Sequence, residues 1–250
     1  MISSARFARR SALVAVALVL GLVSFALPSC TDDSAGIQVP VAYRGGGTLA
    51  DPVETQGDVS VRLLRAHVAV HSLTLEACPA STLARLTAAL SMPVARAHSA
   101  SSPTYLGVPV VLDALGDEVF SPGTFRPTPG TYCGVHGMLA VPDGDALGAS
   151  TSNPLTGAVE LHGERLDAEG QVVSSFTLTS TMSVSFDIDF DEPLVLGPES
   201  LYAEVTLSVD PSAWAAAVTL PDGALDAAGA SALSRAAADA MRLELLRTPR

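Results

Sequence analysis

Strict alternation of apolar and polar residues in the second half of the chain predicts antiparallel β-strands. In residues 182–191 every second residue is apolar and the residues between are Ser or Asp, and residues 201–209 alternate in the same way. Two further alternating segments, 157–166 and 171–178, flank Asp167–Gly170, whose glycine suits the positive-φ position of a hairpin turn. Such strands have one buried and one solvated face, which is typical of antiparallel sheets.

The first half of the chain is less regular but also favours strands. Residues 59–77 alternate with two slips of phase, which predicts either one long bent strand with bulges or two successive strands. Leucines at helical spacing predict a short helix over 81–90. Apolar runs predict strands over 106–112 and 131–141, whereas the prolines and glycines of 121–130 predict turns.

About seven strands separated by turns predict a mainly β protein with one antiparallel β-sandwich domain, of the immunoglobulin-like or Greek-key type, over residues 58–250. A small β-barrel is the second choice. From about residue 224 the chain is rich in alanine, which predicts a short C-terminal helix that Ser231 caps and that runs to about Met241. Residues 241–246 are equally compatible with a closing strand.

The first 29 residues have the pattern of a signal peptide. Three arginines within the first ten residues precede an apolar core that runs from Ala12 to Leu27. This core of 16 residues is shorter than the roughly 20 residues of a membrane-spanning helix. We therefore expect an exported protein, the alternative being an uncleaved N-terminal anchor.

Leu27-Pro28-Ser29-Cys30, at the end of the apolar core, resembles the bacterial lipobox. The resemblance implies that the peptide is cut before Cys30, that the thiol is diacylated and that the new amino group is usually acylated too. Two or three acyl chains give durable anchoring to a membrane. In some bacteria an aspartate directly after the acylated cysteine retains a lipoprotein at the inner membrane. Here that residue is Thr31, which favours the outer membrane. Residues 30–57 then form the lipidated cysteine and a flexible, Gly-containing tether, in which 37–43 is compatible with a short strand.

The charge of the mature chain argues against nucleic acid as a partner. Removing 29 residues removes three of 14 Arg and none of 26 acidic residues, so the net charge becomes 11 − 26 = −15. Such a balance disfavours nucleic acid and anionic lipid head groups as ligands of a basic patch. Aromatic residues make up only 5% of the chain, which disfavours a stacking site for sugars or bases. The membrane, through the lipid, is the predicted partner.

With Cys30 acylated, Cys78 and Cys133 remain as an even pair, which predicts one disulfide in an exported protein. The bond would close a loop of about 55 residues and stabilise the fold by roughly 4 kcal/mol on the chain-entropy model. A thiolate metal site is the alternative, although the CxxC spacing of zinc sites is absent.

The histidines supply the best candidate ligands for copper or zinc. His67 and His71 would lie about 13 Å apart along a strand, so each would need partners from elsewhere. The disulfide would bring the neighbourhoods of His71 and His136 together. The candidate ligands are His67, His71, His98 and His136, and the alternative is that these side chains are half-exposed strand histidines without a metal.

A second candidate metal site is a row of carboxylates. Asp187, Asp189 and Asp191 would project from one strand face about 7 Å apart, where a calcium ion would relieve their repulsion. The turn and glycine of an EF-hand loop are missing. The alternative is an ordinary solvated strand face.

Pro129-Gly130-Thr131-Tyr132-Cys133 resembles the strand entry of many secreted bacterial β-sandwich lipoproteins. Some of these, such as periplasmic relatives of methanobactin-associated copper binders, handle metal, although their tryptophan motifs are missing because Trp214 is the only Trp here. No GxSxG, HExxH or phosphate-loop motif is present, so an enzyme is not expected. The leading prediction is a non-catalytic lipoprotein, acting as a binding or envelope-structural module. The alternatives are a periplasmic copper or zinc binder and an unrecognised enzyme.

Overall fold

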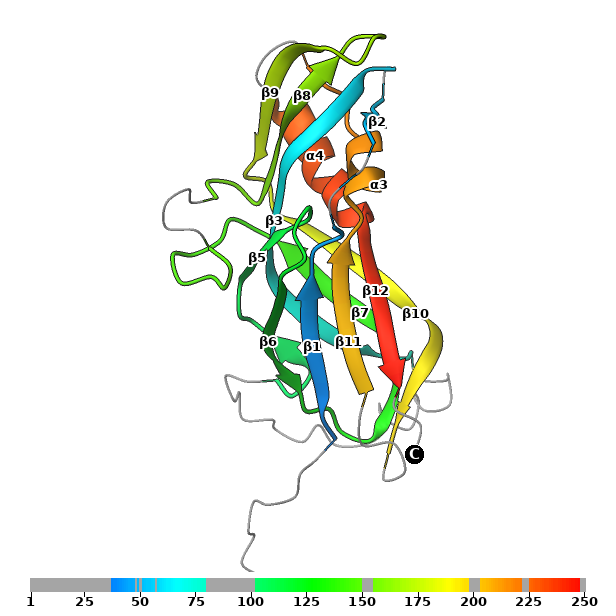
Figure 1. The fold of residues 1–250 in the computed structure, drawn as a ribbon. Helices are drawn as coiled ribbons and strands as arrows, with labels where there is room; N and C mark the ends of the chain where they lie inside the picture. The colour runs from blue at the N-terminus through cyan, green and yellow to red at the C-terminus, as the bar shows by residue number, and fades with distance from the viewer. Residues whose placement is uncertain are drawn as a thin grey trace, which may run out of the picture. The chain divides into compact units, whose positions relative to one another are not determined.

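The computed structural model describes residues 37–47, 49, 51–56, 58–79, 102–149, 155–197, 203–221 and 225–247. The predicted signal peptide, Cys30, the helix expected over 81–90 and His98 lie outside these ranges. Residues 36–250 form one compact unit, and its described part is mainly β, arranged as two sheets with two helices (Figure 1).

The smaller sheet has four strands in the order β12-β11-β1-β6. Its members are β1 (Val39–Arg44), β6 (Val119–Phe125), β11 (Ala203–Val209) and β12 (Met241–Arg247). β1 and β11 pair in parallel, whereas β1–β6 and β11–β12 are antiparallel. The parallel pair is a departure from the all-antiparallel sandwich that the alternation predicts.

The larger sheet is built along β3 (Ser60–Ala77) and has the main order β10-β7-β3-β8-β9. β8 pairs with the first half of β3, and β7 pairs with the second half. The other strands are β2 (Val53–Glu54), β4 (Tyr105–Leu106), β5 (Val110–Asp113), β7 (Gly130–Leu139), β8 (Val159–Leu166), β9 (Val172–Ser180) and β10 (Val184–Leu196). All these pairings are antiparallel.

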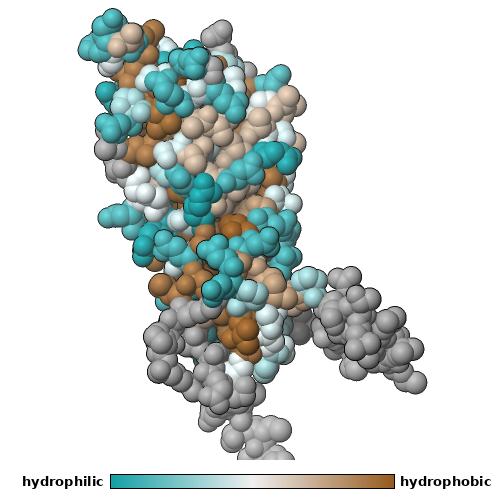
Figure 2. Space-filling model, turned by 90° about the vertical axis from the view of Figure 1, so that its right-hand side faces the viewer, coloured by the Kyte–Doolittle hydropathy of each residue, from teal (hydrophilic) through white to brown (hydrophobic). Residues whose placement is uncertain are grey.

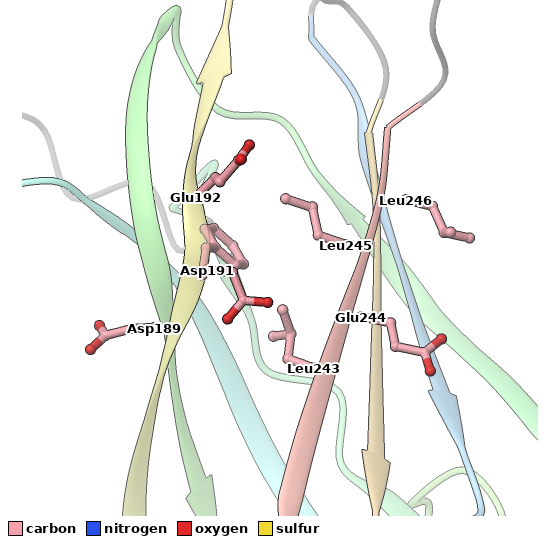
Figure 3. Close-up of a pocket in the computed structure, with 8 residues that line it drawn as sticks. Asp189, Asp191, Glu192, Leu243, Glu244, Leu245 and Leu246 are labelled. Carbon is pink, nitrogen blue, oxygen red and sulfur yellow. The ribbon is translucent and has the colours of Figure 1, made fainter.

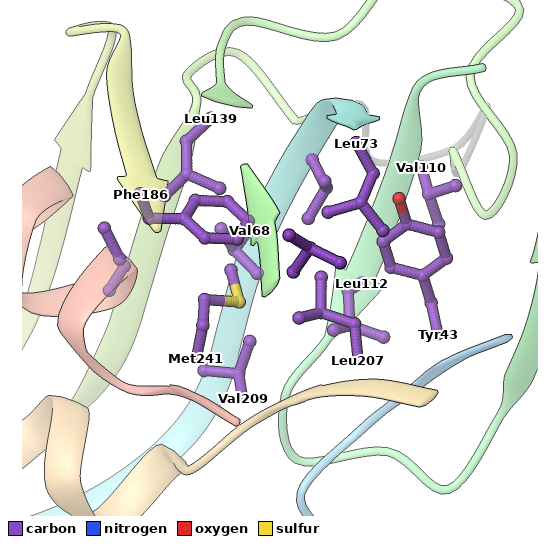
Figure 4. Packing of buried hydrophobic residues seen from close by; sticks show 14 of the residues in the cluster. Tyr43, Val68, Leu73, Val110, Leu112, Leu139, Phe186, Leu207, Val209 and Met241 are labelled. Carbon is purple, nitrogen blue, oxygen red and sulfur yellow. The ribbon is translucent and has the colours of Figure 1, made fainter. Parts of the chain in front are cut away.

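The two sheets pack face to face and bury a continuous apolar core. Figure 4 shows Leu207 and Val209 of the small sheet against Val68 and Phe186 of the large one. The helices are α3 (Pro211–Ala216) and α4 (Ala227–Asp239). They lie beside the part of the large sheet that holds β8 and β9, and α4 contacts β8, β9 and β10. The sheets do not close into a barrel, so the predicted β-sandwich with a short C-terminal helix is confirmed.

The segment predicted as strand over 59–77 is one long bulged strand, β3, the first of the two predicted possibilities. Its pairing register shifts between Leu63 and Arg65 and again between Val70 and Ser72. These shifts lie close to the slips of the apolar pattern. A bulge inserts one unpaired residue, which turns the following side chains to the opposite face.

Two predicted boundaries in the middle of the chain are wrong. The segment expected to hold only turns contains β6, which tolerates Pro122 because a register shift between Val41 and Tyr43 lies opposite it and because β1 is the only described pairing partner of β6. The single strand expected over 106–112 is two short strands, β4 and β5. Pro109 separates them, and they pair with different stretches of β3.

The folded unit begins well before Asp58, so the tether predicted up to Gly57 is too long. β1 lies between β11 and β6, and Val39 and Val41 are at most 1% exposed. Gly46, in the glycine run after β1, packs against another backbone segment: a Cβ atom on Gly46 would lie 2.2 Å from the Val209 carbonyl oxygen. Only glycine permits so close an approach of two backbones.

The C-terminal segment contains both of its predicted alternatives. The helix α4 begins after Asp226, whose side chain accepts a hydrogen bond from the Gly229 amide, so Ser231 lies inside the helix and does not cap it. The helix ends at Asp239, and β12 then closes the small sheet next to β11.

Candidate metal site

The outer face of the large sheet brings three potential metal ligands together. β7 lies between β3 and β10, and the register places His136 opposite Asp187 on one side and Thr74 on the other. Glu76 stands two residues beyond Thr74 on β3, opposite Gly134 of β7. Because alternate residues of a strand share a face, Glu76 and His136 project on the same side of the sheet.

The geometry of this group suits a small cation. The His136 Nδ1 atom lies 2.6 Å from the Asp187 Oδ1 atom, and the ligand atoms of Glu76, His136 and Asp187 all lie within 4.8 Å of one another. Within the described ranges this is the one group of three or more His, Cys, Asp or Glu side chains so close together. The Asp187 side chain is 70% exposed, so the site is open to solvent.

One imidazole and two carboxylates form a donor set of intermediate hardness. Imidazole suits zinc and copper(II), and carboxylates add charge to neutralise a divalent ion. Three protein ligands leave a fourth position for water or another ligand. We call Glu76, His136 and Asp187 the triad below.

A disulfide ties two of the three strands together beside the triad. Cys78 and Cys133 are bonded, with Cα atoms 4.8 Å apart, as predicted. Cys78 follows Glu76 by two residues, and Cys133 precedes His136 by three. The bond therefore holds the end of β3 against the start of β7, where Glu76 and His136 must meet.

The described candidate histidines, His67, His71 and His136, form no common ligand group. His67 lies on β3 with its Nε2 atom 3.8 Å from the Asp113 Oδ2 atom, and this imidazole is the main reason that the pKa of the Asp113 carboxyl lies below its ordinary value. His71 sits at the register shift of β3, and its buried Nδ1 atom has no hydrogen-bond partner among the described residues. Of the described candidates, only His136 belongs to a group of three ligands, because His67 and His71 lie at other positions of β3. His98 is outside the described ranges.

The predicted calcium row is also divided. Asp187 turns to His136, and Figure 3 shows Asp191 directed toward a groove beside β12 while Asp189 points away from it. The register of β10 with β7 shifts between Asp189 and Leu194, which breaks the alternation that the prediction assumed. Among the described residues the three aspartates form no common ligand group.

Sequence reasoning does not find Glu76 or the pairing of His136 with Asp187. The alternating pattern groups Asp187 only with its neighbours on the same strand. The available signal is the predicted disulfide, which places Glu76 and His136 at similar distances from bonded cysteines. Strand order, which decides that β10 lies next to β7, has no local signature in the sequence.

Comparisons with known proteins give little further information. No protein-family model matches the chain, and no curated protein matches it. A solved structure, MbnP from Methylosinus trichosporium, is similar to the chain with 10% sequence identity and a TM-score of 0.30, over 69% of this chain and 75% of that one. None of the described helices has the length and apolar character needed to cross a membrane.

Proposed function

We propose that this protein is an exported, lipid-anchored β-sandwich that binds a divalent transition metal, zinc or copper(II), at the triad. The observation that carries the proposal is the convergence of three ligand atoms within 4.8 Å on one sheet face. The site uses one of the predicted histidines, but its other ligands are carboxylates.

The anchor rests on the lipobox resemblance at Cys30, and a disulfide fits an oxidising compartment outside the cytoplasm. We expect Cys30→Ala to move the protein from the membrane fraction to the soluble fraction. We also expect the mature wild-type chain to begin at Cys30. Unchanged membrane association of the variant, or a different mature N-terminus, contradicts the anchor without touching the metal site.

The metal proposal is tested on the mature chain made soluble by Cys30→Ser. We expect about one equivalent of zinc or copper(II) after desalting, measured by elemental analysis, and a saturable calorimetric titration. His136→Ala, Glu76→Gln and Asp187→Asn should each weaken binding by at least about tenfold, since loss of even a group that only orients a metal ligand costs that much. His162→Ala, which changes a histidine of β8, is the matched control and should bind as the wild type does.

Acid should release the metal because a protonated imidazole cannot bind it. Sub-stoichiometric metal in the wild-type chain, or equal affinity in His136→Ala and the control, contradicts the proposal. The competing function is a metal-free binding or envelope-structural module, in which His136 and Asp187 form a simple ion pair. The short 2.6 Å contact and the exposure of Asp187 are the observations that favour this second function.

A further inference from the structure

The side of the sandwich on which β10 and β12 lie carries a groove of about 680 Å3. Figure 3 shows Leu243 and Leu245 of β12 pointing toward β10 across this groove, with Asp191 and Glu192 of β10 facing them. The volume falls within the range of about 300–1,000 Å3 that is usual for ligand sites. The groove is separate from the triad, whose Asp187 is not among its lining residues.

Both strands beside the groove end their sheets. β12 is an edge strand of the small sheet and β10 is an edge strand of the large sheet. Among the described strands each therefore has a pairing partner on one side only. The unpaired edge of a strand offers backbone amide and carbonyl groups to an additional strand. Four residues of β12, 243–246, line the groove, which corresponds to an edge of about 13 Å at roughly 3.3 Å per residue.

The lining combines apolar side chains with negative charge. Its eight residues include four carboxylates and no basic residue: Asp189, Phe190, Asp191, Glu192, Leu243, Glu244, Leu245 and Leu246. Figure 3 shows Asp191 and Glu192 facing the groove, whereas Asp189 and Glu244 point away from it. Leu246 is 56% exposed. Figure 2, which views the molecule from the side of β10 and β12, shows hydrophobic side chains interspersed with hydrophilic ones there.

We propose that the groove binds an extended, basic segment of a partner protein, which adds to the free edge of β12 as a further strand. Its backbone would pair with β12, and its apolar side chains would contact Leu243 and Leu245 on the groove side. Its basic side chains, which alternate with the apolar ones, would lie on the opposite face beside Glu244. Strand addition uses backbone pairing for affinity and alternate side-chain contacts for specificity. A second copy of this chain is a poorer fit, because with 26 acidic and 14 basic residues the chain is itself acidic.

The probe is a fluorescein-labelled eight-residue peptide of alternating Leu and Arg, titrated by anisotropy into the mature chain carrying Cys30→Ser. We expect saturable binding that weakens as salt is added. Leu245→Gln should weaken binding about tenfold, and Glu244→Gln about threefold at low salt. The controls Val173→Gln and Glu169→Gln change an exposed apolar side chain and an acid near the β8–β9 turn, and should bind the peptide as the wild type does.

Two further measurements distinguish strand addition from attraction by charge alone and from self-association. The same peptide with every backbone amide N-methylated cannot donate backbone hydrogen bonds to β12 and should bind at least about tenfold more weakly. Glu244 is exposed, so Glu244→Gln keeps the test valid if Leu245→Gln does not fold. Equal binding by both groove variants and the controls, or equal binding of the methylated peptide, overturns the proposal. So does a concentration-dependent dimer, seen by sedimentation, that Leu245→Gln abolishes, since a second copy would then occupy the groove.

Discussion

Single polar residues in the core decide how α4 is attached to the sheet. Ser180 and Ser234 are both fully buried, and the Ser234 hydroxyl lies 2.8 Å from the Ser180 Oγ atom and 3.1 Å from the Met182 carbonyl oxygen. The Ser180 hydroxyl donates to the Ala230 carbonyl oxygen at 2.7 Å. Buried polar atoms need such partners, so the pair fixes the helix over the end of β9.

We expect Ser234→Ala to lower the free energy of unfolding by about 1–3 kcal/mol, because it removes a buried hydroxyl that lies within hydrogen-bond distance of Ser180 and Met182. Ser231→Ala, on the same helix, is the control and should change stability by less than about 0.5 kcal/mol, since Ser231 is not the cap. Urea unfolding of both variants measures the difference. Equal losses in the two would show that the hydroxyl network does not hold the helix.

Glycine at one turn position is required by backbone conformation alone. Gly170 has φ +76°, and no atom lies within 4 Å of where its Cβ would be. Gly170→Ala should therefore cost about 1–2 kcal/mol through left-handed strain and not through a clash. Gly144→Ala, where the space is also open but φ is not positive, is the matched control. Thermal unfolding compares them; an unchanged melting temperature for Gly170→Ala would contradict the argument.

At the scale of elements, caps outside the apolar pattern set where the helices begin. Asp210 accepts hydrogen bonds from the amides of Ser212 and Ala213, and from the Ser212 hydroxyl at 2.7 Å. The Ser212 hydroxyl is the main reason that the pKa of Asp210 lies below its ordinary value, and the two amides and Arg242 act in the same direction. The carboxylate form is thus the one that starts α3.

Asp210→Ala should cost about 0.5–2 kcal/mol at pH 7, the usual value of a lost cap. A lowered folded-state pKa contributes stability above the unfolded pKa of about 3.9, and that contribution is lost as pH falls through the folded value. The difference in stability between the variant and the wild type should therefore be constant from pH 7 to pH 5 and shrink below about pH 4. Urea titrations at several pH values check this, and a difference that persists undiminished in acid would refute it.

The elements themselves are predictable where patterning is local. The β8–β9 hairpin follows from alternation and Gly170, and the long β3 follows from alternation with slips. β6 escapes prediction because proline normally argues against a strand, and only the register shift opposite Pro122 makes the strand acceptable. β1 falls within the predicted tether because its glycine-rich flank resembles a linker. That flank packs against Val209 only in the folded state.

At the scale of the whole molecule, the disulfide connects the second half of β3 to β7 and so supports both the fold and the triad. Removing it with Cys78→Ser and Cys133→Ser should lower stability by roughly 4 kcal/mol for a loop of 55 residues. Because Glu76 and His136 lie close to the two cysteines, the double variant should also bind metal more weakly. Unfolding with and without reductant, and metal titration of the folded variant, measure the two effects. Wild-type stability under reducing conditions would contradict the first.

The sequence by itself determined the strand-rich composition, the disulfide pair and the sandwich class, because alternation and cysteine count are local or countable properties. Tertiary structure alone decided the triad and the groove. His136 gains Asp187 and Glu76 only because β7 lies between β10 and β3, and the groove exists only because β10 and β12 end their sheets on the same side. Strand order depends on pairing between segments that are far apart in the chain. His136 and Asp187 are 51 positions apart, and the local pattern of neither strand indicates that the two residues pair.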